Sequence, residues 1–212
     1  RPARTPTRAD CTTCTTFTVR YTAFRSRSRL PTIRSRRSAL APGRRAELNA
    51  AINRHLIEYT QTARISDLAA FHAFDGEPDL SAALQHLAEN GVTLALPVVR
   101  EVPGRSYIAF HEWVPGCDMA PNRFGIMEPT GTDEIPLVRF DLVLLPLVSW
   151  DRRGGRLGMG ESYYDRAFQP FVQSPRPVRM GVGYESQRSE YIPLDPWDIR
   201  LHAMITENGW FT

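Results

Sequence analysis

Residues 141–168, DLVLLPLVSWDRRGGRLGMGESYYDRAF, join an apolar run to a glycine-rich loop and then to a segment with helical character. The apolar run is short and nearly continuous, as is typical of a strand buried on both faces of a parallel sheet. Four glycines and three arginines fill the loop, and Tyr163, Tyr164 and Asp165 follow it. In open α/β sheets, ligands bind beyond the carboxyl ends of the strands, where such loops lead into helices. The stretch therefore predicts an α/β fold with a ligand site at this loop.

Helical and strand-like segments alternate through the rest of the chain. Leu48, Ile52, Leu56 and Tyr59 recur at helical spacing. A second helix is predicted over residues 79–91, where Asp79 can cap the start and Gly91 can end the helix. A short helix is predicted over residues 163–172. Strand patterns occupy residues 67–74, 92–99, 106–113, 140–148, 178–184 and 203–209. This alternation predicts one layered α/β domain, with a mostly parallel central sheet flanked by helices as in Rossmann-like folds.

Length and composition limit the possible functions. The chain has 212 residues, of which 42% are hydrophobic, enough for one sizeable core. No apolar run approaches the roughly 18 residues that a membrane span needs, so no membrane partner is expected. Lysine is absent from the sequence. This excludes Schiff-base catalysis by lysine and a Walker-type phosphate loop, and leaves arginine as the residue for binding phosphates or carboxylates.

The basic charge is concentrated at the start of the chain. Residues 1–46 hold twelve arginines and one acid, a formal charge of +11, whereas the remaining residues hold 14 arginines and 22 acids, a charge of −8. Residues 1–32 are rich in Arg, Thr and Ser and are predicted to be a disordered extension or a transit peptide, with the folded domain over residues 33–212. A nucleic-acid-binding arm is the alternative, but no known nucleic-acid module follows it.

The cysteines and histidines show no catalytic or metal-binding pattern. Three cysteines, Cys11, Cys14 and Cys117, are too few for a disulfide scaffold and suit a reducing compartment, so we expect a cytoplasmic protein. The motif CTTC lacks the two further ligands of a structural zinc site. The five histidines are scattered, and no Ser-His-Asp or Cys-His signature is present.

Taken by itself, the glycine loop allows two interpretations. Glycines let backbone N–H groups approach an anion closely, a helix start adds unpaired donors, and Arg156 can add a forked contact. These features predict a phosphate site. A glycine-rich turn with solvated arginines would have the same composition, and residues 158–163, GMGESY, lack the third small residue of a dinucleotide fingerprint.

The order of the residues is more specific than their composition. The stretch resembles the hallmark segment of the 5-formyltetrahydrofolate cyclo-ligase family, also called methenyltetrahydrofolate synthetases. That segment has a hydrophobic strand, Pro, an aromatic residue and Asp, and then the pattern G-x-R-L-G-x-G-x-G-[YF]-Y-D-R. Further segments resemble other family motifs in the same order, namely IRSRRSALAP (33–42), FHAFDGEPD (71–79), LPVV (96–99), GIMEP (125–129) and IPLDPWDIRLHAMITENG (192–209). The resemblance covers residues 33–207.

The resemblance implies a ligase of one-carbon metabolism. Such an enzyme uses ATP as co-substrate and Mg²⁺ as its ion to convert 5-formyltetrahydrofolate to 5,10-methenyltetrahydrofolate, with release of ADP and phosphate. ATP would phosphorylate the formyl oxygen before N10 attacks the activated carbon, so no covalent protein nucleophile is needed. The partners implied are the folate and ATP, and we expect a monomer.

The resemblance also implies roles for individual residues. The implied catalytic residues are Arg156 and Tyr163, and the implied magnesium ligands are Asp165 and Asp198, whose hard oxygens suit that ion. The implied ATP site is Arg25, Arg29, Arg156, Leu157, Gly158, Met159, Gly160, Glu161, Ser162, Tyr163 and Tyr164. The implied folate site is His72, Glu77, Met159, Gly160, Glu161, Ser162 and Tyr163.

Without the resemblance, these acids have ordinary alternatives. Asp165 would be an acid at a helix start, Asp198 a turn residue and Glu77 a solvated loop acid. The chain also departs from the family pattern, since glycines usually stand where it has Glu161 and Ser162, and the pair Arg25 and Arg29 is one residue out of register. A catalytically impaired folate- or nucleotide-binding paralogue is therefore the second hypothesis.

Overall fold

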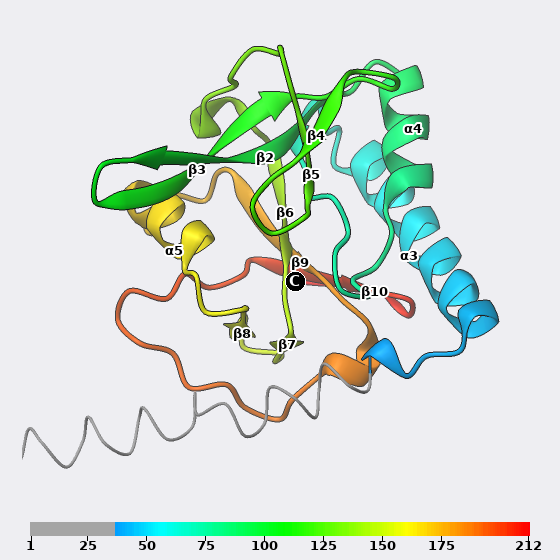
Figure 1. The fold of residues 1–212 in the computed structure, drawn as a ribbon. Coiled ribbons are helices and arrows are strands. Elements are labelled where there is room, and N and C mark those ends of the chain that lie inside the picture. The colour runs from blue at the N-terminus through cyan, green and yellow to red at the C-terminus, as the bar shows by residue number, and fades with distance from the viewer. Residues whose placement is uncertain (1–36) are drawn as a thin grey trace, which may run out of the picture.

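The computed structural model describes residues 37–212, which form a seven-stranded sheet with helices on both faces (Figure 1). The strand order is β11-β10-β9-β6-β1-β2-β3. Five inner strands run parallel: β1 (Asp67–Ala69), β2 (Thr93–Val102), β6 (Leu142–Pro146), β9 (Val178–Val182) and β10 (Ala203–Thr206). The edge strands β3 (Arg105–Glu112) and β11 (Gly209–Phe211) are antiparallel to their neighbours. The predicted α/β fold with a mostly parallel sheet is confirmed.

Side chains of β6 alternate between two hydrophobic cores, because successive residues of a strand point to opposite faces. Leu142 and Leu144 pack with the helices α3 (Pro42–Thr62) and α4 (Ser81–Glu89). Val143 and Leu145 pack on the other face, with Phe168 at the end of α5 (Tyr163–Phe168). These first four residues of β6 are fully buried, which explains why the strand is a continuous apolar run in the sequence.

The two long predicted helices form, although Leu80 and not Asp79 is the N-cap residue of α4. In α3, Leu48, Ile52 and Leu56 are buried at helical spacing. At the start of α4, the Asp79 carboxylate accepts a hydrogen bond from the Ser81 N–H at 2.9 Å. Gly91 follows the helix with a positive φ of 82°, a conformation that glycine adopts without strain.

Several predicted elements are shorter than the sequence indicated; the strand expected over residues 203–209, for example, ends at Thr206. The strand expected over residues 67–74 ends at Ala69, and after the bond from Ala70 N–H to Ala95 O the chain leaves the sheet as a loop. The helix expected over residues 163–172 ends at Phe168 and continues as a 3-10 turn, Gln169–Phe171. Pro170 has no N–H to donate to the preceding turn, which explains this change.

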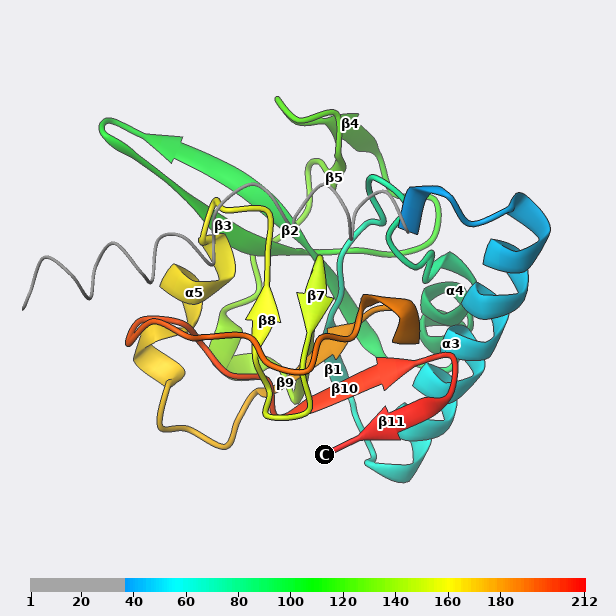
Figure 2. The same cartoon turned by 90° about the horizontal axis from the view of Figure 1, so that it is seen from below.

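Several short elements were not predicted. β4 (Met119–Pro121) pairs with β5 (Met127–Pro129), and β7 (Ser149–Trp150) pairs with β8 (Arg156–Leu157) inside the glycine loop (Figure 2). Two further 3-10 turns span Leu137–Arg139 and Glu185–Gln187. Across residues 37–212, no helix combines the length and apolar character needed to cross a bilayer. The predictions for residues 1–32, including Arg25 and Arg29, lie outside the described residues.

Candidate functional site

A cavity of about 390 Å³ lies at the carboxyl ends of β1 and β6. These two strands are neighbours at the centre of the sheet. The chain leaves β1 through α4 to β2 on one side, and leaves β6 through α5 to β9 on the other. In open α/β sheets, ligands bind at such a switch in strand order. The position of the cavity is therefore the one that the fold itself favours for a ligand.

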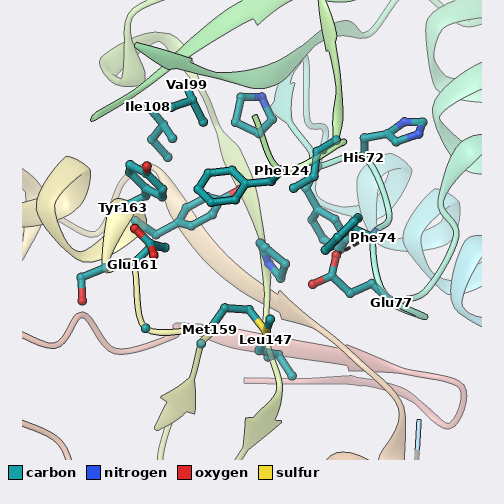
Figure 3. A pocket seen from close by; sticks show the side chains of 18 of the residues that line it. His72, Phe74, Glu77, Val99, Ile108, Phe124, Leu147, Met159, Glu161 and Tyr163 are labelled. Atoms are coloured by element: carbon teal, nitrogen blue, oxygen red, sulfur yellow. Dashed lines mark hydrogen bonds between the residues drawn. The ribbon is translucent and has the colours of Figure 1, made fainter. Parts of the chain in front are cut away.

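The cavity brings together chain segments that are far apart in sequence (Figure 3). Figure 3 shows His72, Phe74 and Glu77 on one side and Glu161 and Tyr163 on the other. They come from the loop after β1 and from the end of the glycine loop, respectively. Apolar side chains, including Val99, Ile108, Phe124, Leu147 and Met159, form much of the wall between them. An apolar cleft with a few converging polar groups is the usual form of a small-molecule site.

The glycine loop has two parts with different surroundings. A Cβ atom at Gly154 would lie 2.5 Å from the Leu201 carbonyl oxygen, and one at Gly155 would lie 2.8 Å from the Asp151 carboxylate. At Gly158 and Gly160, a Cβ atom would meet nothing within 4 Å. Gly158 and Gly160 line the cavity. The first pair of glycines therefore permits close packing of the protein, and the second pair leaves backbone exposed to a ligand.

Asp151 organises the packed part of this loop. Its Oδ1 accepts hydrogen bonds from the Arg153 and Gly155 N–H groups, and its Oδ2 accepts one from the Ile192 N–H. The side chain is buried. These bonds fix the turn that links β7 to β8, so the open part of the loop begins from a rigid base.

Arg156 is buried in β8 and lines the cavity, but its guanidinium is largely engaged by protein. Nη2 donates to Asp165 Oδ1 at 2.7 Å, and Nη1 donates to the Ile199 carbonyl oxygen. The Ile199 N–H donates to the same Asp165 oxygen at 3.1 Å. Arg156 therefore holds the start of α5 against the 198–199 turn, in addition to bringing positive charge to the cavity.

Asp165 and Asp198 line the same cavity although they are 33 residues apart. Asp198 lies in a turn in which its Oδ2 accepts from the Asp195 N–H at 2.8 Å. Within residues 37–212, no group of three or more His, Cys, Asp or Glu side chains has the arrangement of a metal site. Two carboxylates are nevertheless what magnesium commonly takes from a protein when substrate phosphates and water complete its ligands.

Glu77 lies in the loop after β1 and faces the cavity. Its Oε2 accepts a hydrogen bond from the Phe74 N–H, and its Oε1 lies 3.9 Å from Nη1 of Arg37. Burial raises the pKa of Glu77 to about 7, although the Phe74 N–H and Arg37 favour the ionised form. His72 also lines the cavity and is exposed. Two of the seven implied folate residues, His72 and Glu77, thus share one loop.

The two tyrosines at the start of α5 have different environments. The Tyr163 hydroxyl lies 3.0 Å from Ser106 Oγ and accepts from Arg123 Nη2 at 2.9 Å. Burial raises the pKa of Tyr164, and its ring packs near Phe110. Tyr163 therefore connects the glycine loop to β3 and to the β4–β5 turn, whereas Tyr164 belongs to the cavity wall.

Glu161 and Ser162 form the last part of the open loop. Glu161 is exposed, and its carbonyl oxygen accepts from Arg166 Nη1 at 2.7 Å. Ser162 has φ 52° and ψ 27°, the left-handed conformation that a glycine would adopt without steric cost. The backbone here follows a path suited to glycine even though the chain carries a side chain.

Many residues in or beside the cavity were not predicted from the sequence, among them Arg37, Phe124 and Glu128. Arg37 is 1% exposed and contacts the Glu77 loop, but it is one of many arginines in its segment. Phe124 covers the cavity from the β4–β5 turn. Glu128 accepts hydrogen bonds from the Val99 N–H and Asn122 Nδ2, which fix that turn to β2. The motif GIMEP at residues 125–129 contains Glu128, so its resemblance to the family could have pointed to a role for Glu128.

The fold and the site define a class of α/β protein in which a glycine loop and a pair of carboxylates meet an apolar cavity at the sheet's switch point. The chain belongs to the 5-formyltetrahydrofolate cyclo-ligase family, whose model matches residues 22–207. Membership in this family of enzymes was predicted from the sequence and is confirmed.

Named relatives agree with this assignment. The chain is 33% identical over 176 residues to 5-formyltetrahydrofolate cyclo-ligase of Escherichia coli K12, covering 82% of this chain and 96% of that protein. It is 30% identical over 175 residues to the Haemophilus influenzae protein of the same name, covering 82% and 92%. The NMR structure of Aquifex aeolicus 5,10-methenyltetrahydrofolate synthetase has a TM-score of 0.71 and 27% identity, covering 85% of this chain and 89% of that one.

Proposed function

We propose that this protein converts 5-formyltetrahydrofolate to 5,10-methenyltetrahydrofolate, with ATP cleaved to ADP and phosphate. One observation carries the proposal. Glu77 and His72, implied for the folate alone, and residues 158–164, implied for ATP and at 159–163 also for the folate, line a single cavity. Two ligands that must react with each other need such a shared site, because their alignment supplies much of the catalysis.

The reaction has two covalent steps. The formyl oxygen attacks the γ-phosphorus of ATP, and the bond from that phosphorus to the bridging oxygen breaks to release ADP. N10 then attacks the activated formyl carbon and loses its proton. The carbon–oxygen bond breaks, phosphate leaves with the electron pair, and the five-membered ring closes. Both steps spread negative charge over phosphoryl oxygens, so positioning and charge neutralisation are the main tasks of the protein.

The open loop is suited to the nucleotide. We infer that backbone N–H groups of residues 158–162 face the triphosphate, because a Cβ at Gly158 or Gly160 would meet no protein atom. Ser106 and Arg123 hold the Tyr163 hydroxyl, and we propose that Tyr163 contacts both ligands. Arg156 would add positive charge near the phosphates while holding Asp165. Arg25 and Arg29 remain proposed ATP contacts.

The carboxylates of Asp165 and Asp198 fit a magnesium ion in chemical type. Both are hard oxygen donors at the cavity, and Arg156 and the Asp195 N–H orient them. When bound, magnesium would neutralise part of the charge on the phosphates. Glu77 would accept from N–H donors of the pterin ring, and only the ionised carboxylate can do so with both oxygens.

The test is a direct assay of turnover. Protein, 5-formyltetrahydrofolate and Mg-ATP are mixed, and the absorbance rise of methenyltetrahydrofolate is followed. We expect a rise that requires both ATP and magnesium. Equal rates with and without ATP would contradict the proposal. We also propose that the enzyme acts as a cytoplasmic monomer, which its elution volume in size-exclusion chromatography and its location in cell fractions would test.

A second function is favoured by one observation, the left-handed Ser162 next to Glu161 in the open loop. A carboxylate close to phosphate and a strained residue would weaken ATP binding, as in a folate-binding paralogue with little turnover. Binding of the folate by calorimetry without any absorbance rise under saturating Mg-ATP would identify this case.

A further inference from the structure

Arg37 connects three separate segments around the cavity. Its Nη2 donates to Asp75 Oδ2 at 3.1 Å, and its Nη1 donates to the Leu147 carbonyl oxygen at 3.3 Å. Nη1 also lies 3.9 Å from Glu77 Oε1. Leu147 follows β6 and lines the cavity. One guanidinium therefore joins the Glu77 loop to the strand that leads into the glycine loop.

The loop that carries Glu77 depends on this contact for its shape. Asp75 and Gly76 both have positive φ, 51° and 77°, so the chain turns sharply just before Glu77. Arg37 packs over this turn, since a Cβ at Gly76 would lie 3.7 Å from its Cγ. Nε of Arg37 is buried and finds no hydrogen-bond partner among residues 37–212. The contacts with Asp75, Glu77 and Leu147 therefore offset the cost of burying the Arg37 charge.

Within residues 37–212, titratable groups on three elements interact electrostatically with Glu77, and Nη2 of Arg45 would lie 3.7 Å from a Cβ at Gly76 in the same turn. Arg37 lies on the helical residues before α3, Asp75 on the same loop, and Tyr164 on α5. Arg37 lowers the pKa of Glu77 and so opposes the larger effect of burial. Asp75 raises this pKa and so adds to the effect of burial. The two neighbours thus have opposite influences on the same carboxylate.

We propose that Arg37 is a positioning residue of the folate half of the site, which holds the Glu77 carboxylate at the cavity wall through the turn at Asp75 and the Leu147 carbonyl. This inference rests on the proposed function for the identity of the ligand. Arginine suits the role because its planar fork reaches the three acceptors at once, which a lysine ammonium does not. Arg37 acts through Glu77 and has no assigned contact with substrate.

The first experiment follows Glu77 itself and needs no turnover. The carboxyl carbon of Glu77 is observed by ¹³C NMR in glutamate-labelled protein, assigned with Glu77→Gln, and titrated with pH. We expect Arg37→Met to raise the midpoint by about one pH unit, because a nearby cation is lost. Asp75→Asn should lower the midpoint, because an anion is lost. Arg37→Lys should titrate closer to the wild type than Arg37→Met does.

The second experiment measures the two Michaelis constants in the turnover assay. For Arg37→Met we expect the constant for 5-formyltetrahydrofolate to rise about tenfold, with the constant for ATP within about twofold of the wild type. Arg44→Met is the matched control, because Arg44 belongs to the same basic segment but is exposed and pairs with Glu47. The control should leave the Glu77 midpoint and the folate constant unchanged.

The outcomes separate this inference from the proposed function. An unaltered Glu77 midpoint in Arg37→Met, equal rises of both Michaelis constants, or the same changes in Arg44→Met would overturn the role of Arg37. If Arg37→Met does not fold by near-ultraviolet circular dichroism, the midpoints of Arg37→Lys and Asp75→Asn decide. Absence of turnover in the wild type would refute the proposed function, and the NMR titration would still confirm or overturn the contact between Arg37 and Glu77.

Discussion

The two sides of the cavity are built in different ways. On the Glu77 side, a buried arginine, two carboxylates and a sharp turn place one side chain. On the other side, Gly158 and Gly160 leave the backbone open to the cavity, whereas Gly154 and Gly155 pack closely against the protein. In the proposed site, side-chain chemistry therefore decides recognition on the first side, and backbone conformation at two glycines contributes on the second. The two sides should therefore respond to different kinds of mutation.

The largest effect on turnover is expected from changes to the carboxylate pair, Asp165 and Asp198. Asp198→Asn should slow turnover by about two orders of magnitude or more and raise the magnesium requirement, because a charged oxygen donor is lost. Asp165→Asn should have a similar effect and also weaken the contact with Arg156. A magnesium titration of the turnover rate checks both variants. Unchanged titrations would contradict the assignment of these residues to the metal.

The packed and open parts of the glycine loop can be compared directly. Gly154→Ala should lower the free energy of unfolding by about 2 to 4 kcal/mol, because its Cβ would meet the Leu201 carbonyl at a residue with φ of 77°. Gly158→Ala should change it by less than about 1 kcal/mol and weaken ATP binding instead. Urea denaturation and ATP calorimetry provide the two measurements. Similar losses of stability in both variants would show that the loop is not divided in this way.

Restoring the glycines of the family pattern should strengthen the nucleotide side. The double change Glu161→Gly and Ser162→Gly removes a carboxylate from the open loop and the cost of a left-handed serine. We expect the Michaelis constant for ATP to fall by about tenfold, which corresponds to about 1.4 kcal/mol. The single change Ser162→Gly separates the backbone effect from the charge. The same ATP constant in the double variant and the wild type would mean that Glu161 keeps its charge away from the phosphates.

A smaller effect, on stability, is expected at Tyr163, which connects the glycine loop to β3 and to the β4–β5 turn. Tyr163→Phe removes the hydroxyl that contacts Ser106 and Arg123, at a cost of about 0.5 to 1.5 kcal/mol in the free energy of unfolding. Thermal unfolding of this variant, with Ser106→Ala as the control for the same hydrogen bond, checks the value. Additive losses in the double variant would indicate that the two groups act independently.

Much of this arrangement could be predicted from the sequence. The continuous apolar run of β6 indicated a strand buried on both faces, and the motif order indicated the family. The loop ends at Tyr163 and Asp165 because α5 starts there and leads back to the sheet, as the sequence suggested. Asp198, on a distant turn, was assigned to the cavity only through the resemblance.

Other features depend on contacts between distant segments and have no local pattern. Arg37 is buried against Leu147, which is 110 positions away, so nothing in the local sequence distinguishes it from the arginines around it. The division of the glycine loop results from its approach to Leu201 and Asp151, which glycine spacing alone does not reveal. Residues 70–74 have a strand pattern but turn away because the ladder ends at the cavity. In each case a tertiary contact overrides the local preference.

The central claim is that one cavity binds the folate through Glu77 and ATP through the open loop, and the two Michaelis constants of Glu77→Gln test it most directly. We expect the Michaelis constant for 5-formyltetrahydrofolate to rise by an amount that corresponds to a loss of about 1 to 3 kcal/mol in binding free energy. The Michaelis constant for ATP should stay unchanged. In the wild type, folate affinity should also weaken as the pH falls through about 7, where Glu77 gains its proton, and this dependence should be absent in Glu77→Gln. Equal rises in both constants, with the pH dependence retained, would contradict the division of the cavity into a folate side and a nucleotide side.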